Sequence, residues 1–461
     1  MDDRLPDQAK ARPTDPSGWV ALCVGLLAFA SMLVAAPAPA VAVEAYTGAT
    51  IHTGTGKTIE GGTIVVGDDG RIRRVTGDRV DLPPDAEIVE LEGVVTPGFI
   101  DARTHLGLPE IWAVGRTRDQ NRGGGPVRAA FRTADAFNAT SVALPITRTG
   151  GVTSAVIVPG GGWVSGQSAW IDLRGGEHRF GRVAQESTAI HIDATARNPK
   201  KKRTDRLRSR AGVLEKLREL YDDAAFFQKH RKRFNKNRTR PLMASRLDLI
   251  AIGRTFEGKL PVVFRAHRAS DIRRALEFAD AHGLDPIVAG GAEAWMVAER
   301  LAERNVPVIV DPHLNLPTRF ETLGARSDNA ALLADAGVPV VISTFGTHNV
   351  RKLRQLAGNA VRAGMEHGEA LAAVTANPAR AFGLGGTYGT LRKGRRANFV
   401  VWSGDPFELS TDVRRMYIDG RRVSLDNRQQ RLFERYRRLE GRGEPPEPIW
   451  KTPDSEAGGA D

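Results

Sequence analysis

The middle of this chain alternates short apolar runs, rich in β-branched residues, with longer segments that show helical spacing. Strands are expected at residues 98–102, 153–158, 168–173, 188–193, 262–266, 286–289, 306–310 and 340–344. Helices are expected after most of the later strands, at residues 270–282, 292–304, 328–336, 349–363 and 368–375. Parallel strands covered by helices on their faces have this pattern, and a closed ring of such units is a barrel. The sequence therefore predicts an α/β fold with a (β/α)8 barrel of the TIM type over residues 96–383.

The two flanks of the barrel region have a different pattern, in which short strands follow one another without long helices. In residues 43–95, Thr63–Val66 and Arg71–Val75 are separated by Gly-Asp-Asp-Gly, which predicts a hairpin. Residues 384–424 again show strand patterns, and residues 425–461 are expected to form a C-terminal helix and a disordered tail. We therefore expect β structure at both ends of the barrel.

The N-terminal 42 residues resemble a targeting segment. Trp19–Ala36 is an almost unbroken apolar run, and the small residues that follow it, Ala38 and Ala40 or Ala40 and Ala42, suit cleavage by signal peptidase. Residues 1–42 are therefore a predicted signal peptide or, if uncleaved, a membrane anchor, and both alternatives place the folded part in the periplasm or outside the cell. The single cysteine, Cys23, lies in this run, so the exported part has no disulfide and no cysteine metal ligand.

The net charge of +12 comes mostly from one stretch of the chain. Lys200–Arg240 holds 16 Lys and Arg against 5 Asp and Glu, a net charge of +11. Within it, Val213–Phe227 has the spacing of an amphipathic helix, so a basic helical insertion is expected at about residues 199–241. Its charges are either a solvated face or a surface at residues 200–240 for an acidic polysaccharide, an anionic lipid or a substrate with carboxylates. An exported chain is not expected to bind nucleic acid.

The segment Pro97–Gly107 carries a resemblance to a known family. It reads Pro-Gly-Phe-Ile-Asp-Ala-Arg-Thr-His-Leu-Gly, and the amidohydrolase superfamily has the similar pattern Pro-Gly-x-Ile-Asp-x-His-x-His. Five other segments are similar to the imidazolonepropionase-like branch, at residues 150–159, 166–169, 336–339, 375–379 and 404–406. The resemblance implies a composite β-sandwich built from residues 43–95 and 384–424. It also implies a metal-dependent hydrolase that acts on non-peptide carbon-nitrogen bonds of a small molecule.

The residues that would hold the family's metal are altered in this chain. Residues two apart on a strand share a face, so His-x-His offers two imidazoles to one ion. Here the first is Arg103, whose guanidinium has no lone pair to donate and repels a cation, and only His105 remains. By the same resemblance, His191 falls about where the family has a bridging lysine, and His267 matches a histidine ligand.

Two further family positions have no matching side chain. The ligand position of the sixth strand is Gly290, and residues 342–348 contain no carboxylate where a catalytic aspartate is expected. The nearest titratable side chain there is His348, a candidate for the missing acid or base.

These observations leave three hypotheses open. The first is an exported hydrolase with a reduced metal site, in which His105, His191 and His267 hold one divalent ion such as zinc. The second is a non-catalytic, metal-free relative in which Arg103 binds an anionic or carbonyl ligand in the barrel mouth. The third makes residues 200–240 an anchor to an anionic surface of the cell envelope.

Overall fold

The structure is a computed structural model, and it describes residues 43–77, 82, 86–121, 123–175, 179–195 and 209–437. The predicted signal peptide or anchor, the basic residues from 200 to 208 and the end of the predicted C-terminal tail lie outside these ranges. No helix within them is long and apolar enough to cross a membrane.

Eight strands in chain order form a nearly closed barrel, as the sequence predicts. They are β6 (Phe99–Thr104), β7 (Val152–Ile157), β8 (Val164–Asp172), β9 (Arg182–Asp193), β10 (Val262–Ala266), β11 (Pro286–Gly290), β12 (Val308–Val310) and β13 (Val340–Ile342). Most of these strands are buried along nearly their whole length, because side chains fill the barrel and other elements cover its outside. The α/β fold class is confirmed.

The strand β8 departs from the expected parallel arrangement. It runs antiparallel to both β7 and β9, whereas β6 pairs with β7 and β9 through β13 pair with one another in parallel. The connection from β7 to β8 is the short loop of residues 158–163, too short for the crossover that a parallel neighbour needs. A continuously buried apolar run has the same sequence pattern in either direction, so the sequence did not reveal this reversal.

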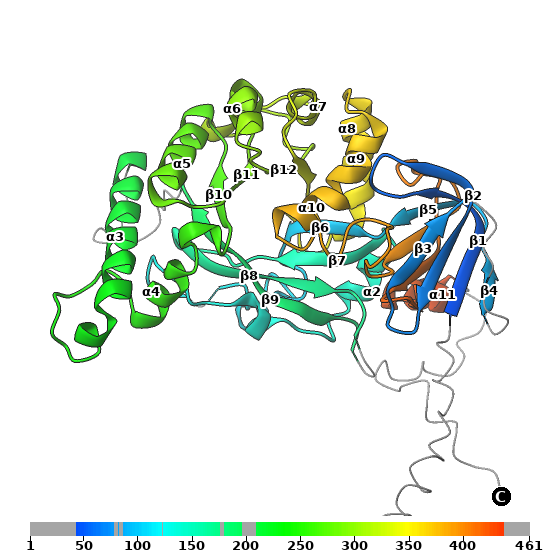
Figure 1. Cartoon of the computed structure of the whole chain (residues 1–461), viewed down its shortest axis with the longest axis horizontal. Coiled ribbons are helices and arrows are strands. Elements are labelled where there is room, and N and C mark those ends of the chain that lie inside the picture. The colour runs from blue at the N-terminus through cyan, green and yellow to red at the C-terminus, as the bar shows by residue number, and fades with distance from the viewer. Residues whose placement is uncertain are drawn as a thin grey trace, which may run out of the picture. The chain divides into compact units, whose positions relative to one another are not determined.

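Helices cover the later strands of the barrel. Figure 1 shows α5 (Ala269–His282), α6 (Ala298–Glu303), α7 (Asn329–Asp335) and α8 (Leu353–Arg362) along the side of β10, β11 and β12 that faces away from β8 and β9. Shorter elements complete this half: η6 (Ala294–Val297), η7 (Phe320–Thr322), η8 (Val350–Lys352), α9 (His367–Ala373) and α10 (Ala376–Ala381). In the earlier loops, the described residues form the short helices η3 (Gly115–Thr117), η4 (Thr133–Ala136) and α2 (Ala143–Arg148).

The predicted helical insertion is present between β9 and β10. It contains α3 (Arg210–Phe234), α4 (Arg246–Gly253) and η5 (Phe256–Gly258). The buried side chains of α3 follow helical spacing and include Val213, Leu217, Leu220, Ala224 and Phe227. They form one core with α4, β10 and α5, so the apolar face of this helix is used for packing. Most of its charged side chains face outward, although Asp223 is buried.

The two ends of the chain build a second, mixed sheet. Its strands are β1 (Val43–His52), β2 (Thr58–Gly67), β3 (Ile72–Thr76), β4 (Glu87–Glu90), β5 (Val94–Pro97), β14 (Phe399–Trp402), β15 (Val413–Ile418) and β16 (Arg421–Arg422). The hairpin of β2 and β3 forms as predicted, and β5 pairs with β14 to join the two ends. A short helix, α11 (Arg428–Tyr436), follows this sheet.

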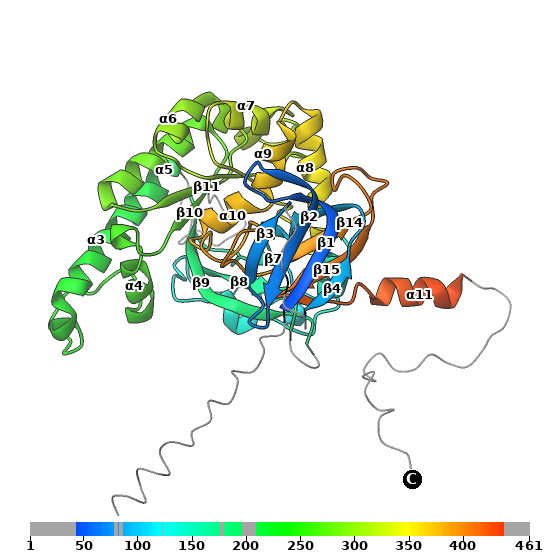
Figure 2. The same cartoon turned by 45° about the vertical axis from the view of Figure 1, so that its right-hand side comes forward.

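This second sheet bends around its own core. The rings of Tyr46, Phe399 and Tyr417 pack within 4.5–5.0 Å of one another. The N–H of Ile72 donates to the carbonyl of Arg395 at 2.8 Å, so the β3 edge meets the segment that leads into β14. Figure 2 shows β1, β2, β3 and β15 together beside the barrel strands. The composite of both chain ends is confirmed.

The barrel closes between β6 and β13 through the side chain of Asp101. Its buried carboxylate accepts hydrogen bonds from the hydroxyls of Ser343 and Thr344 and from the backbone N–H of Thr344 and of Arg103, the last at 3.1 Å. Burial raises the pKa of Asp101, and these hydrogen bonds oppose that rise. This carboxylate therefore fixes the ends of the first and last strands, which carry the candidate site.

Candidate functional site

A cavity of about 260 Å³ lies at the carboxyl ends of β6, β9 and β10. Its lining is formed by Arg103, His105, Pro159, Gly160, Gly161, Ser165, His191, Ile192, Asp193, Val263 and Arg265. In barrels of this type, ligands and substrates bind at this end of the strands. The structure thus brings together Arg103, His105 and His191, three of the side chains singled out in the sequence.

Arg103 supplies a positive charge to this cavity. Its Nε atom has no contact with solvent and no hydrogen-bond partner among the described residues. Its guanidinium lies over the ring of Phe345, 4.9 Å from the centroid. Burial, followed by the charge of Arg265, lowers the pKa of Arg103 to about 10, so the group remains protonated at neutral pH. The cavity therefore contains a permanent cation with a free donor.

Arg265 and Asp193 form an ion pair in the lining. Neither residue was singled out from the sequence. The two residues lie opposite each other on β10 and β9, and Arg265 Nη1 is 3.1 Å from Asp193 Oδ2. The charged side chains of the lining are thus two arginines and one aspartate, which leaves one net positive charge. The signal was available in the sequence, because Asp193 ends β9 and Arg265 is the one charged residue of β10.

His105 and His191 are neutral side chains in the same cavity. His105 Nδ1 lies 2.8 Å from the carbonyl oxygen of Val158, so Nδ1 carries the proton and Nε2 presents a lone pair. Burial, then the charge of Arg103, lowers the pKa of His105 to about 4. The same two causes hold the pKa of the buried His191 well below its ordinary value, and its Nε2 has no partner among the described residues.

His267 and Gly290 form one structural feature. The φ of Gly290 is +102°, and a Cβ built there would lie 2.6 Å from Cε1 of His267. The imidazole of His267 therefore occupies the space that a side chain at position 290 would need. His267 does not line the cavity, and burial, then Arg265, lowers its pKa to about 4. The absence of a side chain at Gly290 therefore leaves the space that the ring of His267 occupies.

The strand-eight candidate, His348, lies apart from the cavity. It is exposed, it is not in the cavity lining, and its backbone carbonyl accepts a hydrogen bond from Arg351 at 3.0 Å. The polar side chains at the end of β13, Ser343 and Thr344, bind Asp101 and do not face the cavity lining. The structure therefore gives His348 no partner at the barrel mouth that would make it a catalytic acid or base.

The side chains of the barrel mouth do not fit a divalent metal ion. A catalytic zinc site needs about three protein ligands that converge on one point. Within the part of the chain that the structure describes, no group of three or more His, Cys, Asp or Glu side chains is placed to hold a metal ion. The ligand set predicted from the sequence, His105, His191 and His267, is not assembled as one group, and His267 is absent from the cavity lining. The guanidinium of Arg103 adds charge repulsion at the same place.

Comparisons with known proteins agree with this architecture. The model of a family described as amidohydrolase family matches residues 252–424. An amidohydrolase from Thermotoga maritima has a solved structure that is similar with a TM-score of 0.74 and 29% identity, over 83% of this chain and 99% of that one.

Two curated proteins are similar over parts of the sequence. The amidohydrolase tasK of Hapsidospora irregularis is 23% identical over 366 residues, which are 74% of this chain and 37% of that protein. An imidazolonepropionase of a Polaromonas species is 40% identical over 101 residues, which are 21% of this chain and 24% of that enzyme. The chain thus spans about a third and a quarter of the lengths of these two relatives.

Proposed function

We propose that this chain is a member of the amidohydrolase superfamily and that it binds a small carboxylate or carbonyl compound in its barrel mouth through Arg103. The observation that carries this proposal is the side chain of Arg103, which lines the cavity and has no hydrogen bond or ion pair among the described residues. A carboxylate or carbonyl oxygen in the cavity can accept a charge-assisted hydrogen bond from this guanidinium, and a carboxylate also neutralises the net charge of the lining.

The neighbouring histidines narrow the kind of ligand. His105 Nε2 is an acceptor, because the proton of this ring lies on Nδ1. A ligand with a hydroxyl or N–H group next to its carboxylate therefore satisfies Arg103 and His105 at once. The cavity volume of about 260 Å³ lies near the lower end of ligand sites, so an acid with few heavy atoms fits it.

A thermal-shift screen of small hydroxy acids, amino acids and matched neutral amides tests this proposal. We expect at least one acid to raise the melting temperature of the wild-type protein and to leave that of Arg103→Met unchanged. The matched control is Arg362→Met, which removes an exposed arginine from the end of α8 and should keep the response. A response of equal size in Arg103→Met would refute the role of this side chain.

A second candidate function is hydrolysis of a non-peptide carbon-nitrogen bond through a reduced metal site. It is favoured by the buried ring nitrogens of His191 and His267, Nε2 and Nδ1, which have no partner among the described residues. Together with His105 they would hold one divalent ion of the zinc type only if the three rings turned toward one point, which they do not share in this structure. Elemental analysis of the purified protein after incubation with zinc separates the two candidates. About one zinc per chain and a chelator-sensitive hydrolysis support this second candidate, and metal-free protein that still binds acids supports the first.

Export of the folded part is a further proposal, supported by the apolar run Trp19–Ala36 and the small residues after it. Mass spectrometry of the protein from its host should find a mature N-terminus near Ala40. An intact N-terminus in a membrane fraction would indicate the anchor. An intact N-terminus in the cytosol would refute export. Association of residues 200–240 with an anionic envelope surface remains a proposal beside it, to be tested by salt-sensitive sedimentation with anionic vesicles.

A further inference from the structure

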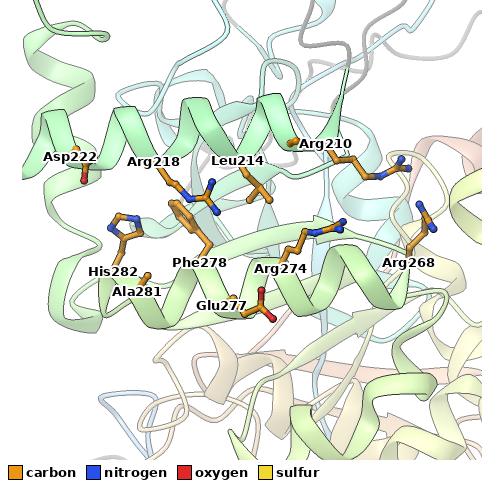
Figure 3. Close-up of a pocket in the computed structure, with 11 residues that line it drawn as sticks. Arg210, Leu214, Arg218, Asp222, Arg268, Arg274, Glu277, Phe278, Ala281 and His282 are labelled. Carbon is orange, nitrogen blue, oxygen red and sulfur yellow. The ribbon is translucent and has the colours of Figure 1, made fainter.

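A second and larger cavity, of about 720 Å³, lies between α3 and α5, away from the lining of the barrel mouth. Figure 3 shows that side chains of both helices point into it. Its lining includes Arg210, Leu214 and Arg218 of α3, with Arg268, Arg274 and Phe278 of α5 and its N-cap. Cavities of this volume are typical of small-molecule sites.

One end of this cavity is strongly basic. Figure 3 shows the side chains of Arg210, Arg268 and Arg274 gathered there, with Arg210 and Arg268 turned toward each other. Arg210 is the first residue of α3 and Arg268 is the N-cap of α5, so both helices begin at this end. The partial positive charges of two helix N-termini therefore add to the charges of the three guanidinium groups.

The acidic partners present neutralise only part of this charge. Arg210 Nε lies 2.9 Å from Asp271 and its Nη2 lies 3.1 Å from Glu321, while Arg274 lies 3.8 Å from Asp271. The guanidinium of Arg268 lies over the ring of Phe320 at 4.9 Å. Among the residues that the structure describes, no carboxylate forms an ion pair with it. Arg268 is thus the cation of this end that is available to a ligand.

The wall next to the basic end is apolar. Leu214 of α3 and Phe278 of α5 face each other across the cavity, and the guanidinium of Arg218 lies beside the ring of Phe278 in Figure 3. The ring of Phe278 also packs against His282 at 4.5 Å, which fixes its position. A flat apolar group between Leu214 and Phe278 would be covered on two sides.

From this arrangement we infer that the cavity between α3 and α5 is a binding site for a small phosphate monoester. The phosphate group binds chiefly at Arg268, with further donors from Arg274 and from the Nη1 of Arg210 that is left beside its two carboxylate contacts. The organic part lies along Leu214 and Phe278. A phosphate has three acceptor oxygens for guanidinium donors that come from different directions, whereas a carboxylate has two and prefers a single fork. This site is independent of the ligand proposed for the barrel mouth.

Isothermal titration calorimetry with phenyl phosphate tests this inference on the purified protein. We expect phenyl phosphate to bind more tightly than inorganic phosphate or benzoate, and phenol not to bind. Arg268→Gln should weaken phenyl phosphate binding about tenfold, the usual effect of losing one charge-assisted hydrogen bond. Arg273→Gln, which changes an exposed neighbour on α5 outside the cavity lining, should leave the affinity unchanged.

Two further variants distinguish binding in this cavity from binding at the barrel mouth and from a diffuse charge effect. Leu214→Gln should weaken phenyl phosphate binding and spare inorganic phosphate, because only the organic part contacts this side chain. Arg103→Met should not change phenyl phosphate binding, because Arg103 lines only the barrel mouth. Equal losses in Arg268→Gln and Arg273→Gln would indicate a diffuse charge effect and overturn the inference. Unchanged affinity in Arg268→Gln, with native unfolding behaviour, would also overturn it.

Discussion

The barrel mouth and the cavity between α3 and α5 both present arginines, but they place them in different surroundings. At the barrel mouth, Arg103 Nε is cut off from solvent and has no partner among the described residues. Around the other cavity, Arg218 and Arg274 are exposed and Arg210 is already paired. A charge in a low-dielectric site interacts strongly with a ligand and costs stability, whereas an exposed charge is screened by water and salt. The two sites should therefore respond very differently to substitution, pH and salt.

The largest difference in unfolding free energy is expected for Asp101, the buried carboxylate between β6 and β13. Asp101→Asn replaces an acceptor of four hydrogen bonds by an amide that satisfies fewer of them. Because the site is fully buried, we expect the free energy of unfolding to fall by about 3 kcal/mol or more. Asp222→Asn, at the exposed cavity, should change it by less than about 0.5 kcal/mol. Urea unfolding of the two variants measures both changes in free energy. Equal changes would show that Asp101 does not stabilise the junction between β6 and β13.

The buried histidines predict a loss of stability in mild acid. The pKa of His105 and that of His267 are about 4 in the folded protein, below the ordinary value of 6.5 given for each. Between these pH values the unfolded chain binds protons that the folded chain does not, so the free energy of unfolding falls as the pH falls. The loss reaches at most about 3 kcal/mol for each histidine at pH 4. Urea unfolding at a series of pH values from 7.5 to 4.5 should show this fall in the free energy of unfolding.

A variant identifies the source of that loss. His105→Gln keeps a donor for the carbonyl of Val158 but cannot bind a proton, so its stability should depend less steeply on pH than that of the wild type. A profile as steep as that of the wild type would assign the acid sensitivity to other groups.

The fold followed from the sequence further than the site did. Apolar runs such as Val262–Ala266 marked the strands, because a buried strand needs apolar side chains on both faces. The direction of β8 did not follow, since burial does not depend on direction. At the site, Arg103, His105 and His191 were found through the resemblance to the family's pattern of metal ligands. The ring position of His267 depends on the φ of Gly290 and on packing between strands, which a sequence pattern does not encode.

Removal of the buried arginine should separate stability from binding. Arg103→Met replaces a desolvated cation by an apolar side chain of similar length. We expect the free energy of unfolding to stay the same or to rise by up to about 1 kcal/mol, with an unchanged or slightly higher melting temperature. The same variant should lose its response to small acids. A melting temperature well below that of the wild type would show that Asp193 or Asp101 depends on this cation for its own stability.

The smallest effect on stability is expected at the exposed cavity, where salt should instead control binding. Arg218→Ala should change the free energy of unfolding by less than about 0.5 kcal/mol, because its guanidinium is exposed. Salt at 1 M shortens the Debye length from about 10 Å to about 3 Å, so phenyl phosphate binding near Arg268 should weaken strongly. Acid binding at Arg103 should weaken less, because the burial of this guanidinium reduces its contact with solvent and salt. Parallel titrations at 0.1 M and 1 M sodium chloride compare the two sites in one protein, and equal salt dependence would mean that Arg103 is as open to solvent as Arg268.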